Sequence, residues 1–415
     1  MSSLVPQMDI TINLNRLRKD LEELSQFGRD SGGGISRPSF SPADFEARSW
    51  LKEKILGAGL DYSQDGAGNI FGRIEAPGKT IMAGSHIDTV VNGGMFDGSV
   101  GVLSALECLR RIKEEGVPLS RPVSMASFTD EEGNLVGDFL GSRAFVGPPD
   151  REILEKGITQ VGRPLSEILE GTDFSIASIM NAHTSRPEIQ VFLELHIEQG
   201  PVLETEEMPI GIVNCIAGKN YWLCRFLGTA SHAGTTPFEL RKDAFLALSD
   251  FALKATHYVA THHYGSMVTV GKVAVHPGAF SIVPGRVDFS LDFRSTSAET
   301  LKDIEETLLG LARETASTRG LDFQFQVMDK TSPVTIPANI RDLMKEECTK
   351  LGYPHMELAS GAGHDAQILA GIVDGGMIFI PCEDGISHSP QERIKWEDLE
   401  KGANLLLRIL LRLAA

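Results

Sequence analysis

The sequence has few cysteines and no long apolar run. Its 415 residues include five cysteines, an odd number, and none of them belongs to a Cys-x-x-Cys pair. This count argues against a disulfide framework and against a thiolate zinc site, so we expect buried free thiols. No stretch of about eighteen apolar residues occurs, which excludes a helix that crosses a membrane.

Positive charge is also scarce. The chain has 39 Lys and Arg against 56 Asp and Glu, a formal net charge of −17, and no run of five or more basic residues. Nucleic acids and anionic membranes need basic surfaces, so neither is an expected partner. An anionic substrate would have to be captured by locally placed arginine. The first residues, MSSLVPQMDI, lack the basic flank and apolar core of a signal peptide, and we expect a cytoplasmic protein.

Length and composition predict a globular protein of two domains. The chain is too long for one ordinary core, and 42% hydrophobic with 23% charged residues is a globular composition. In the outer parts of the chain, buried strands alternate with helices, which predicts an α/β domain with a mostly parallel sheet covered on both faces. The predicted strands include Thr80–Ala83, Val123–Thr129, Val191–Leu195 and Met377–Pro381, and the predicted helices include Ser41–Gly57 and Ser99–Glu115.

The middle of the chain follows a different order of elements. The pattern predicts strand, helix, strand, strand, helix and strand, over Asn220–Gly228, Arg241–Ala260, Met267–Val275, Arg286–Arg294, Ala298–Thr318 and Leu321–Val327. This β-α-β-β-α-β order is typical of an α+β ferredoxin-like unit, here inserted into the first domain. We therefore expect a discontinuous catalytic domain of residues 1–213 and 331–415, and an inserted dimerisation and lid domain of residues 214–330. The exposed edge of its sheet suits pairing with a second copy, so a homodimer is expected.

The rest of the chain is organised around the segment GSHIDTVVNGGMFDG, from Gly84 to Gly98. The strand before it delivers His86 to its carboxyl end, where α/β sheets place their ligands. Asp88 lies on the same face of the extended chain and is well placed to hold a ring nitrogen of His86 or of a neighbour. Asp97 stands just before the next helix. Taken alone, a His-x-Asp pair at a strand end is more typical of a solvated loop.

Other strand ends carry similar residues, and together they form a plausible set of metal ligands. Three imidazoles and two carboxylates suit zinc, with manganese or cobalt as alternatives. Five ligands exceed one tetrahedral site, whereas a carboxylate that bridges two ions about 3.5–4 Å apart accounts for all of them. Glu131, next to a ligand, is then the general base, although an acidic run alone is usually a solvated turn. The proposed ligands are His86, Asp97, Glu132, His196 and His388.

These motifs resemble, over nearly the whole chain, the amidase/hydantoinase/carbamoylase group of the dinuclear-metal aminoacylase and carboxypeptidase family. The similar segments are GSHIDTV, GGMFDG, FTDEEG, LELHIEQGPVLE, GTASHAGTTPFELRKDA, SGAGHDAQ and GISHSPQE. The resemblance implies that His86 and His196 hold one metal, that Glu132 and His388 hold the other, and that Asp97 bridges the two. It also implies that Glu131 is the general base.

The resemblance assigns roles to several further residues. It implies that His232 polarises the scissile carbonyl and that Arg294 binds a substrate carboxylate. Gln199 is expected to orient the substrate. Ser281 stands where this group usually has asparagine, and serine offers a shorter side chain with a single hydroxyl for contact with substrate. We also expect Gly363 to bring the main chain close to substrate, with His364 beside the active rim, because Gly361 and Gly363 permit a close approach.

The sequence therefore predicts a dinuclear-metal hydrolase of N-carbamoyl-L-α-amino acids, which releases amino acid, ammonia and carbon dioxide. Allantoate amidohydrolase is the second hypothesis, and β-ureidopropionase is the third. A protein of a different class, an inactive relative that serves in binding or assembly, is a further alternative. The presence of all five proposed ligands and of Glu131 argues against it.

Overall fold

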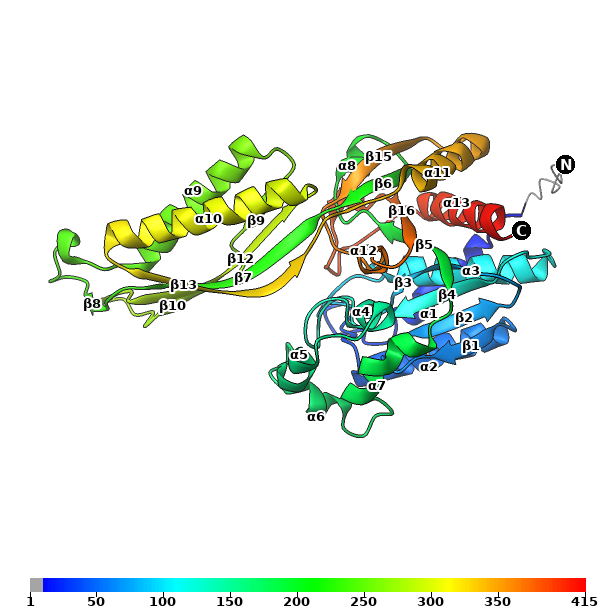
Figure 1. The fold of residues 1–415 in the computed structure, drawn as a ribbon, viewed down its shortest axis with the longest axis horizontal. Coiled ribbons are helices and arrows are strands. Elements are labelled where there is room, and N and C mark those ends of the chain that lie inside the picture. Colours follow the sequence, from blue (N-terminus) through cyan, green and yellow to red (C-terminus); the bar gives the residue numbers. More distant parts are fainter. Residues whose placement is uncertain (1–9) are drawn as a thin grey trace. The chain divides into compact units, whose positions relative to one another are not determined.

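The computed structural model describes residues 10–415. Within the chain, contacts define two compact units (Figure 1). Unit 1 contains the described residues up to Asn214, together with Ile336–Leu358 and His364–Ala415. Unit 2 contains Cys215–Thr335 and Ala359–Gly363.

Unit 1 is built on a mixed sheet whose central strands are parallel, which confirms the predicted mostly parallel sheet. The strand order is β1-β2-β4-β3-β5-β16-β6, and β15 (His355–Ser360) also pairs with β6. The short strand β14 (Val334–Thr335), which belongs to unit 2, pairs with the last two residues of β6. The pairs β4–β3, β3–β5 and β5–β16 are parallel, and antiparallel strands flank them. The main strands are β1 (Asp61–Gln64), β2 (Ile70–Ile74), β3 (Thr80–His86), β4 (Val123–Phe128), β5 (Ile189–Ile197), β6 (Ile210–Ile216) and β16 (Asp374–Ile380).

Every residue of β3 and of β4 is buried, so both faces of this sheet are covered. Helices α1, α3, α11 and α13 pack against one another as one layer, and α12 packs with α4 and against β5 and β16. None of the helices formed by residues 10–415 has both the length and the hydropathy needed to cross a bilayer. The helices are α1 (Leu14–Leu24), α2 (Pro42–Gly57), α3 (Ser99–Glu114), α4 (Leu140–Val146), α5 (Arg151–Lys156), α6 (Leu165–Leu169), α7 (Ile176–Asn181), α8 (Val202–Thr205), α11 (Ala338–Leu351), α12 (Asp365–Leu369) and α13 (Trp396–Ala414).

The predicted start of α2 is confirmed. The Ser41 side chain accepts a hydrogen bond from the backbone N–H of Asp44, and Pro42 occupies the first helical position. A capping hydroxyl satisfies an N–H that has no partner within the helix, and proline lacks the N–H that would otherwise be unsatisfied there. The helix ends at Gly57, as the sequence predicts.

Unit 2 contains the elements β7 (Gly218–Leu227), α9 (Ala244–His262), β9 (Met267–Thr269), β10 (Val273–His276), β12 (Arg286–Ser295), α10 (Ala298–Arg319) and β13 (Asp322–Thr331). Its antiparallel sheet has the order β10-β12-β7-β13, and β9 also pairs with β12. The short pair of β8 (Ser231–His232) and β11 (Ile282–Val283) is separate from this sheet.

One strand prediction in unit 2 is wrong: the segment Met267–Val275 is not continuous but is split into β9 and β10. Four steps along this segment, from Thr269 to Val273, lie opposite three steps on β12, from Asp292 to Phe289. One extra residue is a β-bulge, which interrupts the ladder. The Ser290 hydroxyl accepts from the backbone N–H of Lys272 at 2.9 Å and satisfies a main-chain group at the interruption.

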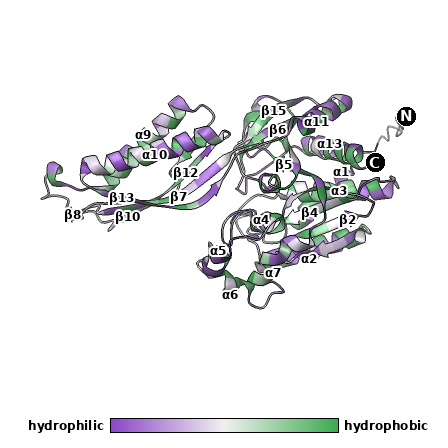
Figure 2. Cartoon of the chain, in the orientation of Figure 1, coloured by the Kyte–Doolittle hydropathy of each residue, from purple (hydrophilic) through white to green (hydrophobic). Residues whose placement is uncertain are grey.

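The sheet of unit 2 has one face toward its core and one away from it. Along β12, buried residues alternate with half-buried ones, as the two-residue period of a strand requires. The buried side chains join those of α9 and α10 in one hydrophobic core, and both helices carry hydrophilic and hydrophobic stretches (Figure 2). Asp288, Asp292 and Arg294 belong to the other face of β12, so the alternation decides which side chains remain available to a ligand.

Candidate metal centre

Neighbouring parallel strands of unit 1 deliver polar side chains to one edge of the sheet. His86 is the last residue of β3, and His196 is the last but one of β5. Glu131 and Glu132 follow β4 closely, and His388 follows β16. The carboxyl ends of parallel strands meet at the same edge, so these side chains gather there.

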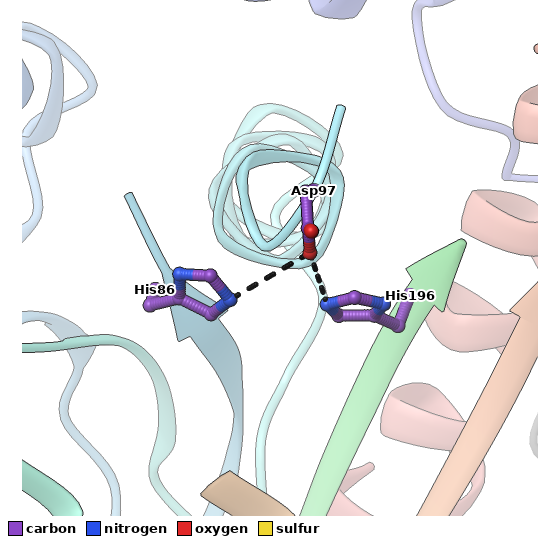
Figure 3. Close-up of side chains that lie close together, drawn as sticks. All are labelled: His86, Asp97 and His196. Atoms are coloured by element: carbon purple, nitrogen blue, oxygen red, sulfur yellow. Dashed lines mark ion pairs between the residues drawn. The ribbon is translucent and has the colours of Figure 1, made fainter. Parts of the chain in front are cut away.

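One group of possible ligands lies around one oxygen of Asp97. The Nε2 atom of His196 is 3.1 Å from Asp97 Oδ1, and the Nε2 atom of His86 is 3.9 Å from the same oxygen (Figure 3). The three ligand atoms lie within 4.8 Å of one another. Ligand bonds to zinc are about 2.0–2.2 Å long, so atoms with this spacing can surround one ion.

A second group lies around the other oxygen of Asp97. The Nε2 atom of His388 is 2.9 Å from Asp97 Oδ2 and 3.6 Å from Glu132 Oε1. These three residues also meet the spacing expected of ligands to one ion. Asp97 therefore belongs to both groups and offers a different oxygen to each.

Backbone carbonyls fix the orientation of two of the histidine rings. His86 Nδ1 is 3.0 Å from the carbonyl oxygen of Asp88, and His196 Nδ1 is 2.8 Å from that of Ile197. A carbonyl oxygen only accepts hydrogen bonds, so Nδ1 carries a proton in both rings. The nitrogen directed at Asp97 is then Nε2, as in histidines that bind metals.

The buried charges of the two groups fit divalent cations. Burial acts to raise the pKa of Asp97, but hydrogen bonds from His196 and His388 hold it well below its usual value. The hydrogen bond to Asp97 raises the pKa of His388 to about 9. Burial, followed by the charge of Asp97, raises the pKa of Glu132 to about 7, and its buried Oε1 has no hydrogen-bond partner. These carboxylates need positive charge beside them, which bound cations would supply.

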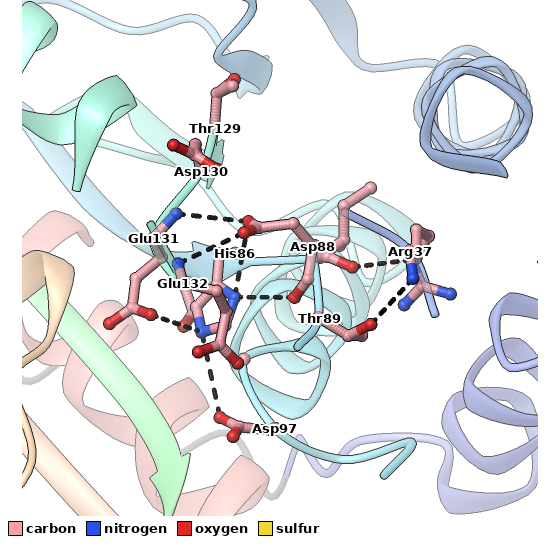
Figure 4. A network of polar contacts seen from close by, with 12 residues as sticks. Arg37, His86, Asp88, Thr89, Asp97, Thr129, Asp130, Glu131 and Glu132 are labelled. Atoms are coloured by element: carbon pink, nitrogen blue, oxygen red, sulfur yellow. Dashed lines mark hydrogen bonds and ion pairs between the residues drawn. The ribbon is translucent and has the colours of Figure 1, made fainter. Parts of the chain in front are cut away.

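Glu131 lies beside the first group without belonging to either (Figure 4). Its Oε2 atom is 3.6 Å from His86 Nε2, and burial raises its pKa well above the usual value. The Asp88 carboxylate accepts from the backbone N–H groups of Glu131 and Glu132 at 3.4 and 3.3 Å. The same carboxylate is 3.6 Å from His86 Nδ1, so the closer contact to that ring is the carbonyl of Asp88.

Gln199 lies at the rim of the centre and contacts the second group. Its side-chain amide donates to Asp97 Oδ2 at 2.9 Å and lies 3.3 Å from His388 Nε2. Its backbone has a φ of 59°, and its N–H donates to the Cys382 thiol at 3.3 Å. Gln199 is thus held at the centre from two sides.

Behind the first group lies a buried contact that sequence reasoning missed. Rings of His364 and His196 meet edge to face with centroids 4.6 Å apart. Glu194, which the sequence analysis did not select, has ligand atoms within 4.8 Å of both histidines. Its carboxylate accepts from Ser85 Oγ at 2.7 Å and from the backbone N–H of Ala366 at 2.9 Å. An acid inside an otherwise apolar strand was the available signal.

Three of the predicted residues belong to the exposed or half-buried parts of unit 2. His232 is exposed on β8, and its Nδ1 accepts from the backbone N–H of Gly234 at 3.1 Å. Ser281 is its close neighbour, because β8 pairs with β11 and the carbonyl of Ser281 accepts from Ala233 N–H at 2.8 Å. Gly363 is the last residue of unit 2.

Arg294, on β12, is held by several acceptors. Its guanidinium donates to the Asp292 carboxylate through Nε at 3.1 Å and Nη2 at 2.8 Å. It also donates to the Tyr221 hydroxyl at 2.9 Å and to the carbonyl of Gly361 at 2.8 Å. Sequence reasoning missed Asp292 and Tyr221, although an Asp-x-Arg pair on a strand was a signal for the first. Arg294 thus presents a fixed, planar head.

Comparison with known proteins gives a consistent result. The sequence profile of Peptidase family M20/M25/M40 matches residues 82–412. The chain is 35% identical over 400 residues to an N-carbamoyl-L-amino-acid amidohydrolase of Paenarthrobacter aurescens, covering 95% of this chain and 97% of that one. It is 33% identical over 410 residues to an allantoate amidohydrolase of Escherichia coli K12, covering 97% and 99%.

A solved structure has a similar fold. It is an amidase of the hydantoinase/carbamoylase family from Burkholderia multivorans, with a TM-score of 0.86 and 31% identity. The similarity covers 97% of this chain and 98% of that one. The match therefore extends to both units.

The residue after Asp97 provides a test of the centre. A Cβ atom at Gly98 would lie 2.4 Å from His86 Nε2. We expect Gly98→Ala to weaken divalent-metal binding at least about tenfold, as losing support of a ligand does, measured by calorimetry on metal-free protein. Gly116→Ala is the control, because both glycines have a φ of 61° but a Cβ at Gly116 would meet nothing within 4 Å. Equal effects of the two changes would assign the loss to backbone strain.

Proposed function

This chain belongs to Peptidase family M20/M25/M40 and is a hydrolase of linear amides, and from this premise we propose that it cleaves N-carbamoyl-L-α-amino acids. The bond broken is a carbamoyl carbon–nitrogen bond, and the products are the L-amino acid, ammonia and carbon dioxide. The observation that carries the proposal is one carboxylate, Asp97, between two ligand groups with Glu131 beside them. The similarity to a carbamoyl-amino-acid hydrolase supports this substrate class.

We assign each group one divalent ion, zinc or else manganese or cobalt. His86 and His196 would hold one ion, Glu132 and His388 the other, and Asp97 both. When bound, the ions supply positive charge that acidifies water and polarises a carbonyl. The imidazole and carboxylate donors, without a thiolate, are suited to these metals.

Glu131 is the proposed proton carrier. Its carboxylate takes a proton from the attacking water and returns it to the nitrogen of the departing amino acid, so protons balance over the cycle. Burial raises the pKa of Glu131, which makes its carboxylate a stronger base for the first transfer. The released carbamate decomposes to ammonia and carbon dioxide. Asp88 supports this role because it accepts from the N–H of Glu131.

The substrate is proposed to be a small anion held by side chains of fixed orientation. Arg294 binds its carboxylate through two parallel N–H groups of the guanidinium, and the substrate oxygens take the places of the Tyr221 hydroxyl and the Gly361 carbonyl as acceptors. Gln199 orients the ureido group from the rim of the centre. Ser281 and the backbone at Gly363 complete the contacts, and serine in place of asparagine leaves a shorter side chain at that point. The net charge of −17 makes local capture by Arg294 necessary.

We propose that unit 2 is a ferredoxin-like lid and dimerisation domain, and that His232 polarises the scissile carbonyl of a partner subunit's substrate. The strands β10 and β13 are the sheet edges and can pair with another chain. His232 is exposed, and Phe238 and Leu240, which follow it in the chain, expose large apolar side chains. Phe280 does so too, and it precedes Ser281, whose carbonyl accepts from Ala233 N–H. Apolar surface of this kind is typical of an interface.

Allantoate is the second candidate substrate, followed by N-carbamoyl-β-alanine. The similarity to an allantoate amidohydrolase favours the former, and allantoate also joins a carboxylate to ureido groups. Ammonia release from N-carbamoyl-L-methionine, allantoate and N-carbamoyl-β-alanine, each with added manganese, cobalt or zinc, ranks the three. A higher kcat/KM for allantoate than for N-carbamoyl-L-methionine would make allantoate the proposed substrate. No ammonia release from any substrate with any metal would favour an inactive binding protein.

The role of Glu131 predicts a variant that binds metal but turns over slowly. Glu131→Gln should retain both ions while kcat falls by roughly 10²–10⁴, the usual loss when a general base is removed. Glu132→Gln is the comparison, because it removes a proposed ligand and should lower metal content. Metal analysis together with steady-state kinetics distinguishes the two. Loss of metal from the Glu131 variant would mean that Glu131 is the metal ligand and Glu132 the general base.

The role of Arg294 predicts a selective loss for anionic substrates. Arg294→Lys keeps the charge but removes the planar fork, so KM for N-carbamoyl-L-methionine should rise about tenfold or more. KM for the neutral amide of the same compound should change less than about threefold. Arg225→Lys is a matched control on the same sheet, since Arg225 is also paired with an aspartate, Asp288. Equal losses for both substrates would make Arg294 structural.

The role of His232 predicts complementation between two inactive variants. In a mixed dimer of Glu131→Gln and His232→Ala, one site is doubly damaged and the other is intact, because that site borrows His232 from its neighbour. Random exchange makes half of the dimers mixed, so roughly a quarter of wild-type activity should return for a closed two-fold assembly. Ammonia release after co-expression measures this. Verified mixed dimers without recovery would refute action across the interface.

A further inference from the structure

Glu392 connects the loop that carries Asp97, the ligand shared by both groups, with the loop that carries His388, a ligand of the second group. It is fully buried, and its Oε1 atom accepts from the backbone N–H groups of Phe96 and Asp97, at 2.8 and 3.2 Å. Its Oε2 atom accepts from the Ser387 hydroxyl at 2.9 Å. One carboxylate therefore holds the backbone of Asp97 and the residue before His388.

The Ser387 hydroxyl extends this connection to the ligands themselves. It lies 3.3 Å from Asp97 Oδ2, the oxygen that faces His388. The backbone N–H of Glu392 donates to the carbonyl of Ser389 at 3.0 Å and closes the turn that directly follows His388. His388 has a φ of 53°, a left-handed conformation that a non-glycine residue adopts only when its surroundings hold it.

The loop before Asp97 has a glycine, Gly94, at the position that packs against the Glu392 carboxylate. A Cβ atom at Gly94 would lie 2.1 Å from Glu392 Oε1 and 2.5 Å from Glu392 Cβ. Gly94 is outside the left-handed region, so an alanine there would be prevented by Glu392 and not by its own backbone. A substitution at Gly94 therefore tests the contact with Glu392 without adding backbone strain.

We propose that Glu392 is a positioning residue, which sets the separation of Asp97 and His388 so that the second group can hold its ion. The inference rests on the two-ion centre of the proposed function and assigns that centre a residue outside both ligand groups. Glu392 touches neither a proposed ion nor the substrate, so it acts through the two loops. Its effect should be larger on the second ion than on the first, which His86 and His196 hold independently of His388.

Two substitutions at this position separate the connection from the charge. Glutamine can accept from both N–H groups through its oxygen and donate to the Ser387 hydroxyl through its nitrogen, so Glu392→Gln keeps the connection. Alanine loses it. Removing the support of a ligand typically costs 10–100-fold in metal affinity. We expect this loss for the second ion in Glu392→Ala and a change below about threefold in Glu392→Gln.

The experiment is a calorimetric titration of the metal-free full-length protein with Zn²⁺ and Mn²⁺, checked by metal analysis. Wild type should bind two ions. Asp243→Ala is the matched control, because Asp243 also accepts from two backbone N–H groups, those of Phe245 and Leu246, but in unit 2. It should leave both affinities unchanged. Binding of fewer than two ions by wild type would contradict the proposed function itself.

A double-mutant cycle tests the contact directly. Gly94→Ala should weaken the second ion as Glu392→Ala does, because it displaces the carboxylate. In a Glu392→Gly background, which lacks both the carboxylate and the Cβ atom that a side chain at Gly94 would meet, the same glycine change should have little further effect. Additive losses would overturn the inference, as would normal binding of both ions by Glu392→Ala. If Glu392→Ala does not fold, Gly94→Ala and Ser387→Ala decide, and normal second-ion affinity in both overturns it.

Discussion

The centre depends on one carboxylate facing two ways. Asp97 can serve both ligand groups only if each of its oxygens points at a different pair of side chains, and those pairs come from different strands. Small displacements of its backbone would therefore change both groups at once. The chain restricts that backbone from either side, with a glycine, Gly98, against His86 and with Glu392 on the N–H of Asp97 itself. Helix α3 begins immediately afterwards and packs on β3, so the carboxylate is attached to the core.

Burial of so many acids in one place is costly unless positive charge accompanies them. Burial raises the pKa of Glu131 and Glu132, whereas hydrogen bonds from His196 and His388 hold the pKa of Asp97 well below its usual value. A pair of bound cations would stabilise all three carboxylates and would let Glu131 exchange protons. The metal centre and the proton carrier are thus consequences of the same buried cluster. The Arg294–Asp292 pair of unit 2 shows the opposite arrangement, in which an acid of the chain already balances the charge of the arginine.

The sequence was most informative where a local pattern determines a position. Apolar runs predicted the strands, and residues directly after them, such as His86, do lie at strand ends. The capped start of α2 was predicted for the same reason. Contacts between distant segments could not be predicted. Glu392 and Asp97 are almost three hundred residues apart, and neither segment contains a pattern that indicates contact with the other. Glu194 was hidden inside a buried strand, and the bulge after Thr269 depends on its pairing with β12.

The most direct test of this account is the position of the metal ions. Crystals of the protein loaded with zinc would be measured by anomalous scattering at the zinc absorption edge. The account predicts two peaks about 3.5–4 Å apart, as in other two-metal sites. One peak should lie next to His86 and His196, the other next to Glu132 and His388, with Asp97 bound to both. A single peak, or a pair that Asp97 does not join, would contradict it.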